Sequence, residues 1–294
     1  GSPSDGVIFL DVVTDPINPI YLGEWSDFYV HDGMARGDTM YVGCIYEGDL
    51  YVVDVSDKTN PQNLGNVTTP SVFTHNAWVS DDGNFVFTTD EQSDAYIGSY
   101  DISDLNNIQE VDRIQSNPGS NSIPHNTHVD GNFIITSYYR DGTVVHDITN
   151  PNNLIEVAHY DSSPLSGDGF QGCWGTYPFL PSGNIISSDI DYGSITKGRL
   201  LVYSRDFLQA CYLEGNVTDI SNSLPITNAT IEIINPNLTI QTNSDLAGNY
   251  MSGIANSSSY DIIFSAPGYL SDTINASFTN GNTTIVDAQL QALS

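Results

Sequence analysis

Three histidines lie in similar local sequences, and an acidic or amide side chain follows each of them. The three pairs are His31–Asp32, His75–Asn76 and His125–Asn126, in the stretches FYVHDG, VFTHNAW and IPHNTHVDG. Neutral imidazoles bind zinc, copper, iron and nickel, and the Asp and Asn side chains can orient the rings from outside the coordination sphere. If the fold gathers these histidines, the sequence predicts a site for zinc or a similar transition metal ion, with His128 as a fourth ligand.

Three imidazole ligands would leave one coordination position for water, as metal-assisted hydrolysis or oxidation requires. A structural interpretation is equally open, because repeated sequences duplicate structural corners as readily as functional ones. The imidazoles would then bond backbone carbonyls of neighbouring repeats. A third interpretation is a polar pocket for an anion or a small ligand.

A second set of candidate ligands is acidic. Asp189 and Asp191, in SSDIDYG, share one face of an expected strand because side chains alternate along a strand. Two carboxylates favour a calcium site here over acid–base catalysis. The chain has no G-x-S-x-G elbow, no H-E-x-x-H pair and no Walker loop. We therefore predict no catalytic residue.

Internal repeats predict the elements that must position these side chains. Segments such as GDLYVVDVSDKTNPQNLGNV combine an alternating apolar strand, a D-x-[ST] turn and a second strand. Two further strands precede several of these segments, as in THNAWVSDDGNFVFTTDE. Together they form a four-stranded unit of about 45 residues, the period of a β-propeller blade. Radial repetition would bring the three histidines to one end of the propeller axis.

The expected blades do not complete a ring. Residues 1–26 supply the last two strands of a blade, and residues 163–207 supply about three strands. Full blades are expected at 27–70, 71–118 and 119–162. Because the sequence starts in the middle of a blade, we expect an N-terminally truncated or mature fragment.

The composition changes after residue 210, where Trp and His disappear and Asn, Ser, Thr and Ile increase. Short strand patterns with turn signals at 8–12 residue spacing predict a small antiparallel sandwich. We therefore predict an all-β protein with a propeller at 1–208 and a sandwich at 211–294.

The propeller segments resemble a known family. DGVIFLDV, GDLYVVDVSD, FTHNAWVSDDGNFVFTTDE, IPHNTHVDGNF and GCWGTYPFLPSGNIISSDI are similar to LVIVD repeats of secreted bacterial choice-of-anchor B proteins. The resemblance covers roughly residues 5–205. It implies a cell-surface setting and no settled activity.

The C-terminal region resembles the carboxypeptidase regulatory-like, or transthyretin-like, domain. The matching positions are Gly215, Pro225, Ala229, Asp245, Gly248, Tyr250, Gly268 and Tyr269. The resemblance implies a stalk or spacer on a secreted protein, without catalytic residues.

The net charge excludes some classes of binding partner. The chain of 294 residues carries 36 acidic and 7 basic side chains, a formal net charge of -29. Such a chain repels nucleic acid and anionic lipid, so we expect neither as a partner. No apolar run is long enough to insert into a membrane. The three cysteines do not form a disulfide scaffold, although one disulfide stays open.

Glycosylation sequons are concentrated near the C-terminus. N-x-[ST] sequons occur at Asn66, Asn216, Asn228, Asn237, Asn256, Asn275 and Asn282, and a bacterial O-glycosylation pattern occurs at Thr39 and Thr273. The tail therefore reads as an exposed stalk.

Taken together, these patterns favour a non-catalytic secreted or cell-surface protein. It would bind or assemble through its propeller, by self-association or with an extracellular protein or glycan, and use the sandwich as a spacer or joint. The alternative is a metal-dependent enzyme with a His-ligated ion at the propeller axis.

Overall fold

The computed structural model describes residues 5–190, 198–235 and 238–293, and these residues form strands and no helix. They fall into two compact units. The first contains residues up to 145 together with 159–205, and the second contains 146–158 together with 206 onwards. The all-β fold class is confirmed.

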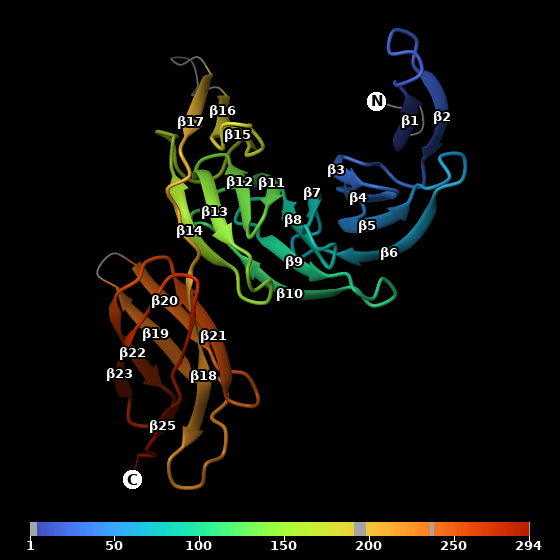
Figure 1. The fold of residues 1–294 in the computed structure, drawn as a ribbon. Coiled ribbons are helices and arrows are strands. Elements are labelled where there is room, and N and C mark those ends of the chain that lie inside the picture. The colour runs from blue at the N-terminus through green and yellow to red at the C-terminus, as the bar shows by residue number, and fades with distance from the viewer. Residues whose placement is uncertain (1–4, 191–197, 236–237, 294) are drawn as a thin grey trace. The chain divides into compact units, whose positions relative to one another are not determined.

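The first part of the chain forms a two-stranded ribbon followed by four sheets, which we call the first to fourth blades (Figure 1). The ribbon is β1 (Val7–Asp11) and β2 (Ile20–Trp25). The first blade is β3 (Asp32–Arg36), β4 (Thr39–Cys44), β5 (Asp49–Asp54) and β6 (Gln62–Thr68). The second is β7 (Thr74–Val79), β8 (Phe85–Asp90), β9 (Ile97–Asp101) and β10 (Gln109–Ile114). The third is β11 (Pro124–Asp130), β12 (Phe133–Tyr138), β13 (Gly142–Asp147) and β14 (Ile155–Tyr160). The fourth is β15 (Gly172–Tyr177), β16 (Ile185–Ile190) and β17 (Arg199–Tyr203).

Each blade is an antiparallel meander, and the strand content agrees with the repeat pattern of the sequence. The first strands of consecutive blades, β3, β7, β11 and β15, contact one another. Both faces of β5 are covered, which explains why DLYVVD is buried along nearly its whole length. Leu50 and Val52 pack against the second blade, while Tyr51 and Val53 pack against the ribbon through Trp25. One core cluster, which includes Leu50, Val79 and Tyr100, lies between the first and second blades. This stacking of sheets is propeller-like.

The D-x-[ST] motif forms the same turn in successive repeats. The Oδ1 atoms of Asp54, Asp101 and Asp147 each accept a hydrogen bond of 2.8 Å from the backbone N–H two residues later. Such Asx turns satisfy a backbone donor where the strand ends. The turn therefore explains the repeated aspartate by local structure alone.

The sandwich has two sheets. One has the order β21–β18–β24, with β25 also beside β18, and the other has the order β20–β19–β22–β23. Their strands are β18 (Cys211–Asp219), β19 (Thr230–Asn235), β20 (Leu238–Asn243), β21 (Asn249–Ile254), β22 (Ser259–Ser265), β23 (Asp272–Ser277), β24 (Thr283–Ile285) and β25 (Ala288–Leu290). A buried core that includes Leu213, Ile231, Tyr250 and Phe264 fills the space between them. Gly215 permits close backbone approach, because a Cβ there would meet the Val286 carbonyl oxygen at 1.9 Å.

Residues 146–158 pack within the same unit as the sandwich. Asp147 is fully buried, and its Oδ2 accepts a 2.6 Å hydrogen bond from the Ala210 N–H. The Asn153 side-chain amide donates to the Ser252 carbonyl at 2.8 Å. Ile155 packs with Ala210 and Tyr212. The turn after β13 and residues 155–158 of β14 thus belong to the second unit.

Asp147 therefore has a larger stabilising role than its counterpart in the second blade. We expect Asp147→Ala to lower the free energy of unfolding by about 2–3 kcal/mol, because it leaves buried N–H groups without a charged acceptor. The matched control is Asp101→Ala, which removes the same turn bond at a more exposed position and should cost about 1 kcal/mol. Urea unfolding of both variants measures the difference, and equal losses would contradict a special role for Asp147.

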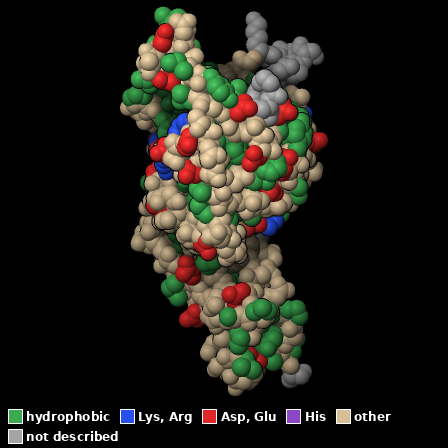
Figure 2. Space-filling model, turned by 90° about the vertical axis from the view of Figure 1, so that its right-hand side faces the viewer, with side chains coloured by type: hydrophobic (Ala, Val, Ile, Leu, Met, Phe, Trp, Pro, Cys, Tyr) green, Lys and Arg blue, Asp and Glu red, His purple; other side chains and the backbone are tan. Residues whose placement is uncertain are grey.

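The structure answers the questions that the sequence raised about cysteines, surface charge and membrane spans. All three cysteines are buried and free, so the disulfide that the sequence left open is not formed. Acidic side chains are spread over the face shown in Figure 2. No helix in the described part of the chain is long and apolar enough to cross a membrane.

Candidate metal site

The three predicted histidines occupy equivalent corners at the start of the first strand of three blades. His31 immediately precedes β3, while His75 and His125 are the second residues of β7 and β11. The register of β7 shifts between Thr74 and Asn76, and that of β11 shifts between Pro124 and Thr127. A bulge re-aims side chains at the end of a strand, so the repeat places a bulge at the histidine in both blades.

Gly43 allows the first and second blades to approach each other at this corner. Its carbonyl accepts a 3.0 Å hydrogen bond from the His31 N–H. A Cβ on Gly43 would lie 2.5 Å from the Thr74 carbonyl oxygen and 2.9 Å from the backbone of His75. Glycine is therefore required here for the close packing that brings His31 beside His75.

The three imidazoles form a continuous row. The ring centroids of His31 and His75 are 4.4 Å apart, and those of His75 and His125 are also 4.4 Å apart. The structure thus gathers His31, His75 and His125 in space, although 94 positions separate the first from the last along the chain. His31 is exposed, whereas the other two are buried.

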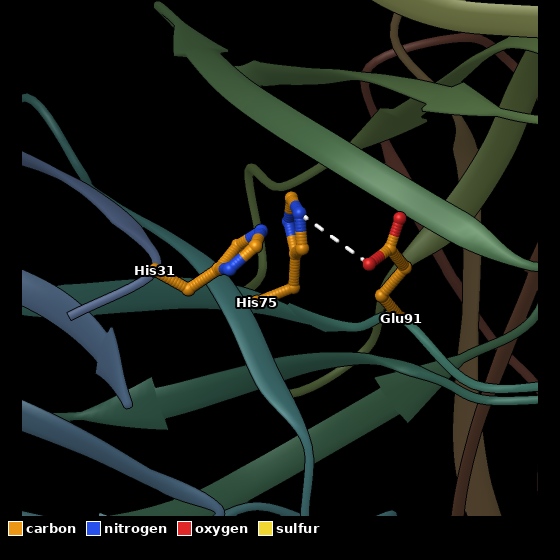
Figure 3. Close-up of side chains that lie close together, drawn as sticks. All are labelled: His31, His75 and Glu91. Carbon is orange, nitrogen blue, oxygen red and sulfur yellow. Dashed lines mark ion pairs between the residues drawn. The ribbon is translucent and has the colours of Figure 1, made fainter. Parts of the chain in front are cut away.

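Glu91 joins this row from the residue that follows β8 (Figure 3). Its Oε2 lies 3.6 Å from His75 Nε2, and its Oε1 lies 3.7 Å from His125 Nε2. Tyr139, which follows β12, donates a 2.7 Å hydrogen bond from its hydroxyl to Glu91 Oε1. Burial raises the pKa of the Glu91 carboxyl, while the Tyr139 hydrogen bond opposes that shift.

The sequence predictions missed Glu91 and Tyr139. Both occupy the position directly after the second strand of a blade. The N–H of each bonds a carbonyl two residues before a site histidine, Phe73 for Glu91 and Ile123 for Tyr139. The sequence offered only a weak signal, because this position is polar in the second and third blades but is Ile45 in the first.

Burial keeps the inner imidazoles neutral. Desolvation, with smaller contributions from His125 and His31, lowers the pKa of His75 to about 2. Desolvation also lowers the pKa of His125 to about 4, although its bond to the Trp174 carbonyl acts in the opposite direction. Neutral imidazoles offer lone pairs, which is the form in which histidine binds metal ions.

Three potential metal-ligand atoms lie close enough together to form a metal site. A nitrogen of His31, a nitrogen of His75 and a carboxylate oxygen of Glu91 all lie within 4.8 Å of one another. Two histidines and one carboxylate form a ligand set known from zinc sites. A small contraction of these side chains would allow all three atoms to bind one ion.

The fourth blade carries a tryptophan in place of the histidine. β15 shifts register between Cys173 and Gly175, so Trp174 occupies the bulge position that His75 has in β7. His125 Nδ1 hydrogen-bonds the Trp174 backbone carbonyl. The two rings are 5.3 Å apart, and the Trp174 side chain is 49% exposed.

The three residues predicted to orient the imidazoles form hydrogen bonds with each other. Asp32 Oδ2 accepts hydrogen bonds from the side-chain amides of Asn76, at 3.1 Å, and Asn126, at 2.7 Å. Asn76 Oδ1 accepts from the Thr127 N–H at 3.1 Å. In the described residues these side chains thus link the inner strands of three blades, and their hydrogen bonds do not reach an imidazole.

His128 lies apart from the imidazole row. Its ring packs against Trp78 at 4.5 Å and Phe179 at 6.0 Å, and burial lowers its pKa to about 4. The structure therefore does not bring this predicted fourth ligand together with His31, His75 and Glu91.

The other predicted sites are scattered. Asp189 is buried, accepts a 2.8 Å hydrogen bond from the Ser162 hydroxyl and pairs with Arg199 at 2.9 Å. Its proposed calcium-binding partner, Asp191, and the sequon residue Asn237 lie outside the described residues. The exposed glycosylation candidates are Asn66, Asn228, Asn256, Thr273, Asn275 and Asn282, whereas Thr39 and Asn216 are half-buried.

Comparison with known proteins identifies the C-terminal unit. Residues 212–291 match the family model of the carboxypeptidase regulatory-like domain. The region contains all strands of the sandwich except the first residue of β18. No curated protein matches the chain. The protein is therefore an all-β protein in which propeller-like blades precede a carboxypeptidase regulatory-like domain.

Several solved structures are similar to this chain at low sequence identity. A protein from Lactobacillus plantarum is 11% identical with a TM-score of 0.51, over 95% of this chain and 79% of that one. The periplasmic gluconolactonase of Pseudomonas aeruginosa is 11% identical with a TM-score of 0.44, over 91% of both chains. Hydrazine synthase of Kuenenia stuttgartiensis is 14% identical with a TM-score of 0.43, over 84% of this chain and 66% of that one. The likeness to the Lactobacillus plantarum protein concerns the fold alone.

Proposed function

We propose that this protein binds one divalent transition metal ion through His31, His75 and Glu91. The observation that carries the proposal is the convergence of imidazoles and a carboxylate from two blades within 4.8 Å. Imidazole favours zinc, copper, nickel and iron over calcium and magnesium, which prefer oxygen ligands. No comparable group of ligands supports the predicted calcium site in the described residues, and Asp189 already pairs with Arg199.

The setting that best suits such a module is the cell surface. The carboxypeptidase regulatory-like match at 212–291 supports a spacer or joint, as the sequence predicted. The repeated blade turns support membership of the LVIVD, choice-of-anchor B proteins, and with it secretion. The propeller-like unit would then bind an extracellular protein or glycan, or a second copy of the chain.

A metal-dependent enzyme is the second candidate. It is favoured by one observation, because two histidines and a carboxylate are also the ligand set of catalytic zinc sites that keep a position open for water. The exposed side of His31 would give a substrate access to the ion.

Zinc binding tests the proposal directly. Isothermal titration of the metal-stripped full chain with Zn²⁺ should give one ion per chain. The double variant His75→Ala/Glu91→Gln should bind more than about 100-fold more weakly, since even partners of ligands are worth ~10–100-fold in affinity. The control His128→Ala removes a half-buried histidine outside the row and should bind Zn²⁺ normally. Wild-type protein that takes up no Zn²⁺, Cu²⁺, Ni²⁺ or Co²⁺ would refute metal binding.

A further inference from the structure

We infer that His125 is a fourth ligand, so that the bound ion has a closed coordination sphere and joins three consecutive blades. The inference rests on the proposed metal site and extends it. It assigns the ion a stabilising role, because a sphere filled by four protein ligands has no position for a substrate. The sheets joined are those that contribute His31, His75 with Glu91, and His125.

The hydrogen bond of His125 Nδ1 fixes which nitrogen is free. The Trp174 carbonyl oxygen can only accept, so Nδ1 carries the proton and donates it to that oxygen. The other nitrogen, Nε2, then holds a lone pair in the neutral ring. That lone pair lies 3.7 Å from Glu91 Oε1. A backbone carbonyl behind an imidazole is the usual partner of a metal-bound histidine.

Without a cation this arrangement is electrostatically unfavourable. Glu91 is flanked by the Nε2 atoms of His75, at 3.6 Å, and His125, at 3.7 Å. Glu91 is half-buried, and among the described residues no lysine or arginine forms an ion pair with it. A carboxylate withdrawn from water is stabilised by such a charge. The Nδ1 atom of His75 is buried and also lacks a hydrogen-bond partner in the described part of the chain. A metal ion bound to the Nε2 atoms and the carboxylate supplies the missing positive charge.

The distances suit one ion. Metal bonds of about 2.0–2.1 Å place tetrahedral ligands roughly 3.3 Å apart. The two Nε2–oxygen distances, which end on different oxygens of Glu91, exceed that value by only a few tenths of an ångström. His125 lies outside the group of atoms within 4.8 Å of one another, so its ring must move toward His31 and His75 for Nε2 to reach the same ion. His31, whose ring centroid is 4.4 Å from that of His75, is exposed, and its Nδ1 lies 3.4 Å from the Tyr29 hydroxyl. Binding the ion requires this ring to move inward.

Two further groups hold the site in place. Tyr139 donates to Glu91 Oε1 and thereby orients the carboxylate. The carbonyl of Trp174 orients His125 from the fourth blade. Tyr139 and Trp174 are positioning residues, and neither needs to touch the ion.

Cobalt substitution tests whether protein ligands fill the coordination sphere of the ion. Tetrahedral Co²⁺ absorbs visible light strongly, whereas six-coordinate Co²⁺ absorbs weakly, because the centre of symmetry suppresses its d–d bands. Co²⁺-loaded wild-type protein should show an intense four-coordinate spectrum that added azide leaves unchanged, because no bound water is there to be displaced. His125→Gln should bind Co²⁺ ~10–100-fold more weakly and show a spectrum that azide alters, because water fills the vacated position, while its amide can still donate to the Trp174 carbonyl.

Added imidazole provides the complementary measurement. In His125→Ala, imidazole should replace the water in the vacated position and restore the wild-type band positions and the lack of response to azide. The control His128→Ala should match wild type throughout. If His125→Gln and His125→Ala keep the wild-type spectrum and affinity, the fourth-ligand assignment is wrong and the site is open. If wild-type protein binds no Co²⁺ or Zn²⁺, the proposed function itself fails, and this inference fails with it.

Discussion

Zinc should stabilise the wild-type protein strongly and the Glu91→Gln variant hardly at all. A ligand that binds only the folded state contributes about 4 kcal/mol when its free concentration is 1,000 times its Kd. For a unit of this size that corresponds to an increase in Tm of roughly 10 °C. Scanning calorimetry with and without Zn²⁺ measures the shift.

Without metal, Glu91→Gln should be at least as stable as the wild-type protein. Burial raises the pKa of Glu91, which means that the ionised carboxylate is costly in its metal-free environment. Glutamine has the same shape without the charge and accepts the Tyr139 hydrogen bond equally well. We therefore expect metal-free Glu91→Gln to be as stable as wild type or slightly more stable.

Glu110→Gln is a suitable control, since Glu110 lies in the same blade and pairs with the partly exposed Arg113. It should respond to Zn²⁺ as the wild type does. An equal zinc-induced rise in Tm for wild type and Glu91→Gln would show that the ion binds elsewhere.

Acid should destabilise the protein through His146, which lies outside the proposed metal site. His146 is fully buried, and burial lowers its pKa from 6.5 to about 4. Neither ring nitrogen has a hydrogen-bond partner among the described residues. In the unfolded chain this ring takes up a proton near pH 6.5, whereas in the folded protein it does so only near pH 4.

The sign of the effect follows from this difference. A folded-state pKa below the unfolded value means that the stability is complete above pH 6.5 and falls as the pH is lowered from 6.5 to 4. The full shift corresponds to about 3 kcal/mol. We expect His146→Leu to remove this part of the acid sensitivity at little cost at pH 7, because an apolar side chain of similar size replaces an unsatisfied polar one.

Urea unfolding at pH 7.0, 5.5 and 4.5 measures the pH dependence. His159→Leu is the matched control, since His159 is an exposed histidine on the adjacent strand β14. It should retain the wild-type slope. If His146→Leu loses stability between pH 7 and 4.5 as steeply as wild type, His146 is not the responsible group.

The candidate site was only partly predictable from the sequence. The repeated H-[DN] corner identified His31, His75 and His125 as side chains that converge, and the structure brings them together. His128 followed the same reasoning but lies beside Trp78, because it is three residues beyond the corner of the strand. Glu91 gave no distinct signal, since one acidic residue among many in a chain of net charge -29 cannot be singled out by type.

The sequence by itself determined the blades and the sandwich, because alternating apolar residues, Asx turns and glycines act within a few residues of one another. The number of strands in each repeat and the position of the composition change follow from such local patterns. Only the tertiary structure decided which polar groups face each other. Glu91, Tyr139 and the Trp174 carbonyl meet the histidines across three neighbouring blades, and the burial that keeps those imidazoles neutral exists only once the blades have packed.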